Sequence, residues 1–230
     1  MKKGLFLITI FFIGLNFVQA QSSTNTASTY NYNDAFAPFF YKQNGNEYRA
    51  ASGEPGPKYW QNKADYNLAV SLNEASNEIV GTEILSYTNN SPQNLNFVWM
   101  QLDQNLFKED SRGNAIVPIN GSRNAGHGQK FDAGFNIQSV SVLSGIKNEI
   151  ATEVKYMIEE TRMQIFLPKA IAAKGGNLKL KIKYSFISPD YGSDRMGVMQ
   201  SKNGKIFCVA QWYPRIAVYD DVLGLSLIHI

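Results

Sequence analysis

Few residues of this chain have the chemistry of a catalytic or metal-binding group. The sequence contains one cysteine, Cys208, and two histidines, His127 and His229. His127 stands in a glycine-rich loop pattern, where an exposed histidine without a second ligand is expected. Cys208 lies in an apolar run with no adjacent base, so we expect a small buried side chain and not a nucleophile. These residues predict no metal site, no disulfide framework and no catalytic residue in this chain.

Two groups of charged residues could support other chemistry. Adjacent carboxylates, as at Asp220 and Asp221, raise one pKa of the pair and could serve acid–base work or bind Ca²⁺. We favour a polar turn or a contact to a further domain. Lys179, Lys181 and Lys183 share one face of a predicted strand, which we interpret as a solvated face that deters edge pairing. The formal net charge is +3 with no long basic run, so no nucleic-acid partner is expected.

The elements that must position these side chains have the period of β-strands. Leu178, Leu180 and Ile182 alternate with lysines, a pattern that is typical of a strand with one buried face. The same reasoning predicts an all-β fold, an antiparallel β-sandwich or saddle, in which Leu68, Val70, Leu180 and Ile182 point inward. Residues 168–174 could form one helical turn. The predicted strands cover residues 66–72, 79–87, 95–102, 135–143, 154–158, 163–167 and 178–186.

The two ends of the chain differ in composition from the strand-rich part. Residues 1–20 hold two lysines, an apolar stretch and a final Ala20, which is the pattern of a secretory signal peptide. The stretch is shorter than the roughly 20 apolar residues of a membrane span. We therefore expect an exported protein, periplasmic or extracellular, with no transmembrane segment after cleavage. Residues 21–63 indicate an extended leader, residues 64–224 a β domain, and residues 225–230, which resemble sequencing-adapter read-through, a non-native tail.

Four stretches of the chain resemble the N-terminal domain of the aminopeptidase N family of zinc metallopeptidases, in the form of its exported bacterial members. The resemblance extends from about Tyr59 to Gly224. It implies that Gly81 lies where two strands approach closely, and that the last stretch leads into a catalytic domain. The four stretches are Tyr66–Leu72, Ile79–Asn89, Asn94–Leu102 and Gln211–Asp221.

The resemblance also implies a role without catalysis for this chain. In the family, a His-Glu-x-x-His helix holds Zn²⁺ and a Gly-x-Met-Glu-Asn strand binds the substrate amino terminus. Neither motif occurs here. The resemblance therefore implies a truncated N-terminal domain that forms one wall of the substrate cleft, while zinc and peptidase activity belong to a missing catalytic domain of the same protein. It further implies that Gln211 contacts the amino-terminal end of a peptide substrate.

A free-standing secreted β-sandwich is the alternative function. It would bind peptides or glycans through exposed rings such as Trp60, Trp99 and Trp212. A domain that docks a catalytic partner should instead keep an apolar patch at the contact. We therefore expect several apolar residues around Gln211 to be exposed on one side, among Phe207, Val209, Trp212, Tyr213, Ile216, Val218 and Tyr219.

Overall fold

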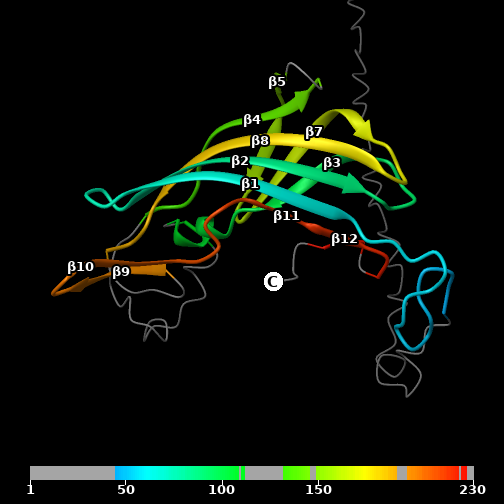
Figure 1. Cartoon of the computed structure of the whole chain (residues 1–230), viewed down its shortest axis with the longest axis horizontal. Helices are drawn as coiled ribbons and strands as arrows, with labels where there is room; N and C mark the ends of the chain where they lie inside the picture. Colours follow the sequence, from blue (N-terminus) through cyan, green and yellow to red (C-terminus); the bar gives the residue numbers. More distant parts are fainter. Residues whose placement is uncertain are drawn as a thin grey trace, which may run out of the picture. The chain divides into compact units, whose positions relative to one another are not determined.

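The computed structural model describes residues 45–108, 110–111, 132–145, 149–190, 196–222 and 224–226. The chain divides into a unit over residues 1–43 and a second unit over residues 44–230, and every described residue belongs to the second. That unit is an antiparallel β-sandwich (Figure 1). The expected signal peptide, most of the expected leader and residues 227–230 lie outside the described residues.

The larger sheet has five antiparallel strands in the order β1-β2-β8-β4-β5. Its inner face carries large apolar side chains at alternate positions of each long strand, because successive side chains of a strand point to opposite faces. Leu85, Leu180 and Ile182 on this face are fully buried. The strands are β1 (Lys63–Asn73), β2 (Glu78–Asn89), β8 (Gly176–Ile187), β4 (Asn136–Ser144) and β5 (Ile150–Glu153).

A smaller sheet of four antiparallel strands supplies the opposite side of the core. Met100, Met163 and Ile165 from this sheet are fully buried and belong to the same apolar cluster as Leu85 and Leu180. The core therefore lies between the two sheets, as in other β-sandwiches. In spatial order the strands are β11 (Arg215–Ile216), β3 (Leu95–Gln101), β7 (Arg162–Ile171) and β6 (Tyr156–Glu159).

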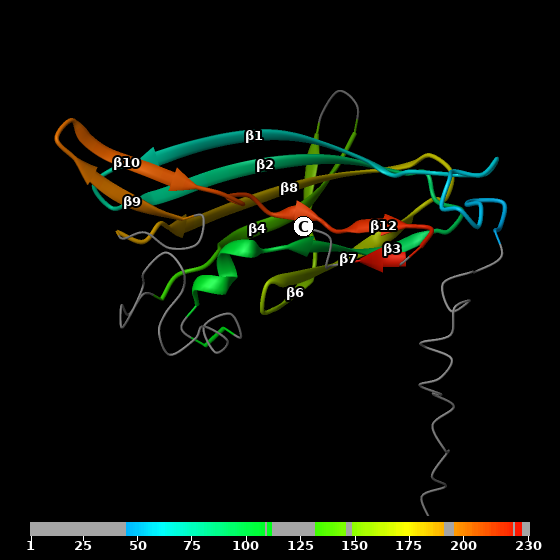
Figure 2. The same cartoon turned by 90° about the horizontal axis from the view of Figure 1, so that it is seen from below.

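Two hairpins and one helical turn complete the described fold. The hairpin of β9 (Met196–Ser201) and β10 (Gly204–Val209) lies at one end of the five-stranded sheet (Figures 1 and 2). There Lys205 Nζ donates hydrogen bonds to the carbonyl of Glu74 at 2.6 Å and to Asn77 Oδ1 at 2.9 Å. The other elements are β12 (Val218–Asp220), β13 (Gly224–Ser226) and the 3₁₀ turn η1 (Asp103–Phe107). No helix in the described ranges is long and apolar enough to span a membrane.

The sequence predicted the antiparallel all-β sandwich correctly, and the structure corrects its details. The strand predicted over residues 154–158 corresponds to β6, which begins two residues later, at Tyr156, whereas β5 over Ile150–Glu153 was not predicted. The possible helical turn over residues 168–174 is wrong, since β7 continues to Ile171. The helical turn is η1 instead, directly after β3. Gly224–Ser226, at the start of the expected tail, pairs with β12.

The inward direction predicted for Leu180 and Ile182 is confirmed, but Val70 is not buried. Leu68 is half-buried, while Val70 and Leu72 are 50% and 43% exposed. Val70 pairs with Gly81 and Leu72 with the buried Ile79, so both lie on the inner face. Alternation fixes the face of a residue, whereas burial also requires an opposing layer, which does not cover the last part of β1.

The lysine stripe cannot protect an edge, because β8 lies between β2 and β4. Lys179, Lys181 and Lys183 do lie on the outer face of β8, opposite to its buried residues. Lys179 forms an ion pair with Glu149. The expectation of a solvated face is therefore correct, and the expectation that it deters edge pairing is wrong.

Candidate functional site

Gln211 lies directly after β10 in an unusual backbone conformation. Its φ is +51°, in the left-handed region that residues other than glycine seldom adopt. Such a conformation costs about 1–3 kcal/mol and persists only where surrounding contacts enforce it. The Gln211 side chain is half-buried and makes no hydrogen bond within the described part of the chain. The amide is thus available to a ligand.

The contacts that hold Gln211 come from η1. Gln104, which is 2% exposed, donates from its Nε2 to the carbonyl of Ala210 at 2.9 Å and to the carbonyl of Gln211 at 3.1 Å. One buried amide therefore satisfies two consecutive backbone carbonyls. Burial of the amide makes the arrangement rigid, because an unpaired polar group in the interior is costly.

The residues after Gln211 are fixed to three different elements. Asp103 of η1 accepts two hydrogen bonds on its Oδ2 from Arg215, at 2.8 Å and 3.2 Å. The hydroxyl of Tyr66 on β1 accepts the Ile216 N–H at 2.9 Å. The Ala217 N–H donates to the carbonyl of Trp99 on β3 at 2.8 Å. Gln211 therefore begins a segment that is held in place over its whole length.

An acidic residue is buried close to this segment. Glu83 lies on the inner face of β2, is 0% exposed, and neither of its carboxylate oxygens has a hydrogen-bond partner among the described residues. Burial raises the pKa of Glu83 from 4.5 to about 8. Burial also raises the pKa of Tyr66 to about 12, and the Glu83 charge adds to that rise. The Glu83 carboxyl therefore keeps its proton at neutral pH.

Aromatic rings connect this carboxyl to the segment. The Tyr213 ring packs against Tyr66, with centroids 5.3 Å apart, and against Trp212, with centroids 5.1 Å apart. A carboxyl buried beside aromatic rings lies in an environment of low dielectric constant. The candidate site is therefore the Gln211 amide on a rigid segment, with the aromatic cluster and Glu83 behind it.

Asp221 and Asp220 have structural roles. Asp221 pairs with Arg49 through two hydrogen bonds, of 2.9 Å from Nε and 2.8 Å from Nη2. The Arg49 guanidinium holds the pKa of the Asp221 carboxyl below its usual value. Asp220 accepts the Val222 N–H at 2.9 Å, which makes the predicted polar turn. The observed contact of Asp221 is to Arg49, within the expected leader.

The prediction that Cys208 is buried is wrong. Cys208 is exposed, because β10 alternates and only one face of its hairpin packs on the fold. Cys208 and Ile206 point away from that packed face. Both histidines, His127 and His229, lie outside the described residues.

The predicted apolar patch around Gln211 is also wrong. Of the seven residues expected there, only Val218 is exposed, at 47%. The rings that were candidates for glycan binding are not exposed either, since Trp60, Trp99 and Trp212 are all half-buried. Five of the seven pack against the main core, namely Val209, Trp212, Tyr213, Ile216 and Tyr219.

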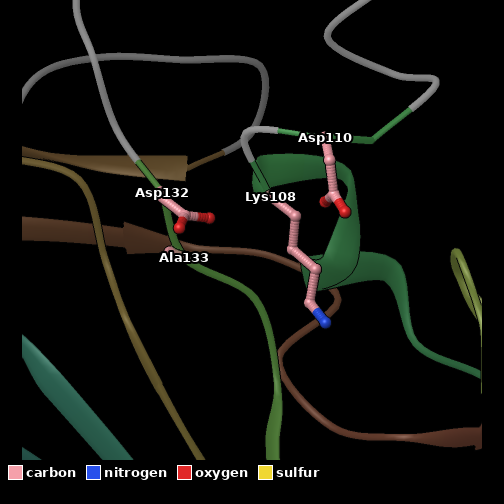
Figure 3. Close-up of a pocket in the computed structure, with 4 residues that line it drawn as sticks. All are labelled: Lys108, Asp110, Asp132 and Ala133. Atoms are coloured by element: carbon pink, nitrogen blue, oxygen red, sulfur yellow. The ribbon is translucent and has the colours of Figure 1, made fainter.

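An open cavity of about 570 Å³ lies beside the end of η1 (Figure 3). It is lined by Lys108 and Asp110 after η1, and by Asp132 and Ala133 before β4. Both chain segments lead into residues 112–131, outside the described residues. No group of three or more His, Cys, Asp or Glu side chains in the described ranges could hold a metal ion. The donor set for zinc is thus not found in this part of the chain.

The sequence led to Gln211 through the resemblance, but not to Glu83, Asp103 or Gln104. For Glu83 a signal existed, since it alternates in phase with Leu85 on the buried face of β2. For Asp103 and Gln104 the polar pattern after β3 resembles an exposed loop, although both residues are buried. Their role depends on contacts with residues more than a hundred positions away.

Comparison with models of known protein families finds no match for this chain, and comparison with curated proteins finds no matching relative.

Proposed function

We propose that this chain is the non-catalytic β domain of an exported zinc aminopeptidase, and that it forms one wall of the cleft that binds peptide substrates. The observation that carries the proposal is the geometry of Gln211. Its left-handed backbone is held by Gln104, while its side-chain amide makes no hydrogen bond in the described part of the chain. A side-chain amide on a backbone held in this way can accept a hydrogen bond from a substrate ammonium group.

The positions of the resembling stretches support this proposal. Three of them coincide with β1, β2 and β3, and the fourth is the segment that starts at Gln211. Gly81 fits the implied close approach, because a Cβ there would lie 2.3 Å from the Tyr184 ring on the neighbouring strand. Zinc and the residues that activate water would be supplied by a catalytic domain of the same protein.

The test is the activity of the complete reading frame that contains this chain. We expect it to encode a His-Glu-x-x-His motif and to hydrolyse aminoacyl p-nitroanilides, with activity lost on chelation and restored by zinc. Gln211→Ala should lower kcat/KM about 10- to 100-fold, mainly through KM. That range corresponds to one hydrogen bond to a charged group, worth about 1.5–3 kcal/mol.

Gln200→Ala is the matched control, because Gln200 is an exposed glutamine on β9. It should leave kcat/KM unchanged. Gln104→Ala should weaken substrate binding as a positioning residue, since it frees both backbone carbonyls without touching substrate. A reading frame without the zinc motif, or equal activity of Gln211→Ala and Gln200→Ala, would refute the proposal. In that case titration of the chain with peptides and glycans would test the binding-module alternative.

A further inference from the structure

The free edge of β1 is the longest strand edge in the described fold. β1 has 11 residues and pairs on one side only, with β2. The other edge strands of the two main sheets are short, since β5 and β6 have four residues each and β11 has two. No main-chain hydrogen bond between described residues reaches the outer edge of β1. Proteins usually keep such edges short or protect them with charge.

The second half of this edge carries no such protection. From Asn67 to Asn73 the strand contains no charged residue and no proline. Every residue from Ala69 to Asn73 is exposed. Val70 and Leu72 are apolar residues on the inner face that the second sheet does not cover. The edge therefore offers both unpaired backbone groups and an uncovered apolar row to another strand.

The sequence of this half is nearly a palindrome about Val70. It reads Asn-Leu-Ala-Val-Ser-Leu-Asn. If the strand pairs with a copy of itself in antiparallel direction about a two-fold axis at Val70, residues of the same kind face each other. Leu68 then lies opposite Leu72 of the second copy, and Val70 opposite Val70. A symmetric dimer interface requires this self-complementarity, because the same patch is used on both subunits.

We propose that two copies of this chain associate through antiparallel pairing of Asn67–Asn73 about a two-fold axis at Val70. The axis runs perpendicular to the sheet, so the inner faces of the two subunits stay on the same side. The two five-stranded sheets join into one continuous sheet. No like charges meet across the pair, since Lys63 and Asp65 lie before the paired segment. A single strand pair makes a small interface, so the dimer forms in the weak class of association.

Sedimentation of the full chain over a range of concentrations tests the proposal. We expect a monomer–dimer equilibrium for the wild type. Val70→Lys places two ammonium groups opposite each other and should weaken dimerisation by about tenfold or more. Val70 is half-exposed, so the fold should survive, as circular dichroism will verify. Val80→Lys is the control, because Val80 is 39% exposed on the internal strand β2 and should leave the equilibrium unchanged.

Disulfide trapping tests the register independently, in a Cys208→Ser background. Val70→Cys should form a disulfide-linked dimer on mild oxidation, because residues directly opposite on antiparallel strands lie about 4.5–5.5 Å apart at Cα. Leu72→Cys should not, because its own copy would lie four residues further along the pair, about 13 Å away. A monomer at all concentrations, equal effects of the two lysine variants, or cross-linking through Leu72→Cys would each overturn the proposal.

Discussion

Replacing Glu83 by glutamine should make folding stability less sensitive to pH between 4.5 and about 8. Glu83 is fully buried without a hydrogen-bond partner in the described part of the chain. Its pKa is raised from 4.5 to about 8 by burial. The folded protein therefore keeps the proton to a higher pH than the unfolded chain. Below pH 4.5 the group is protonated in both states and has no effect on the free energy of unfolding.

The size of the effect follows from the two pKa values. Between pH 4.5 and about 8 the unfolded chain releases this proton and the folded protein retains it. The free energy of unfolding then falls by about 1.4 kcal/mol per pH unit, or about 5 kcal/mol over the whole window. The stability lost by pH 7 is about 3 kcal/mol. Many domains have only about 5–15 kcal/mol in total.

Urea unfolding at several pH values measures this effect. Glu83→Gln has nearly the same shape but no ionisable proton, so its stability relative to the wild type should rise by about 3 kcal/mol from pH 5 to pH 8. Glu153→Gln, at an exposed position of β5, is the control and should follow the wild-type pH profile. A constant difference between the Glu83→Gln variant and the wild type across this range would show that the carboxyl is not buried without a partner, and would refute the reasoning.

Two further substitutions test the packing that positions the site. Gly81→Ala should destabilise the fold by about 1–3 kcal/mol, because its Cβ would lie 2.3 Å from the Tyr184 ring. Most of this cost should disappear in a Tyr184→Leu background. An unchanged cost there would show that the clash with the Tyr184 ring is not what destabilises the variant. Asn105→Ala should lower the free energy of unfolding in urea by about 2–4 kcal/mol. The reason is that buried Asn105 accepts the Phe135 N–H and donates to the carbonyl of Glu160, both at 2.8 Å. Asn177→Ala, at an exposed position, should be nearly neutral, and equal effects of the two variants would argue against a structural role of the Asn105 hydrogen bonds.

The sequence predicts the strands well because the sheets of this fold have one buried face and one solvent-exposed face. In β8 the apolar residues Leu178, Leu180 and Ile182 alternate with lysines, and the structure buries the first group only. This pattern is local, so it can be read without knowing the partner strands. The order of the strands is not local. The assignment of the lysine stripe to an edge was wrong because pairing of β8 with β2 and β4 depends on distant segments.

Burial depends on the opposing layer, and this explains why Val70 is exposed although it faces inward, and why the prediction for Cys208 was wrong. Both residues belong to apolar patterns, and both are exposed. Val70 lies beyond the region that the second sheet covers. Cys208 lies on the outer side of a two-stranded hairpin, which packs through one face only. In a strand, an apolar pattern indicates which residues can be buried, and only the tertiary contacts decide which of them are.

The candidate site shows the same division between local and distant information. A glutamine at position 211 can be recognised in the sequence through the resemblance, but its left-handed backbone cannot. That conformation depends on Gln104, which lies 107 residues earlier and follows a strand that ends in a polar run. No local pattern connects the two positions. The most informative part of the site is therefore a contact between two segments that the sequence presents as ordinary loops.

Two features of the fold are unusual for a stable β-protein. Glu83 places an unpaired carboxyl where the pattern of β2 expects an apolar residue, and β1 leaves a long neutral edge without protection. Departures of this kind are expected at functional sites, because elsewhere selection for stability removes them. Glu83 faces Leu68 of β1 across the strand pair, and Leu68 also belongs to the palindromic segment Asn67–Asn73. The strand that pairs with Glu83 on one side is therefore the strand whose outer edge we propose as the subunit interface, so both departures from the rules meet on β1.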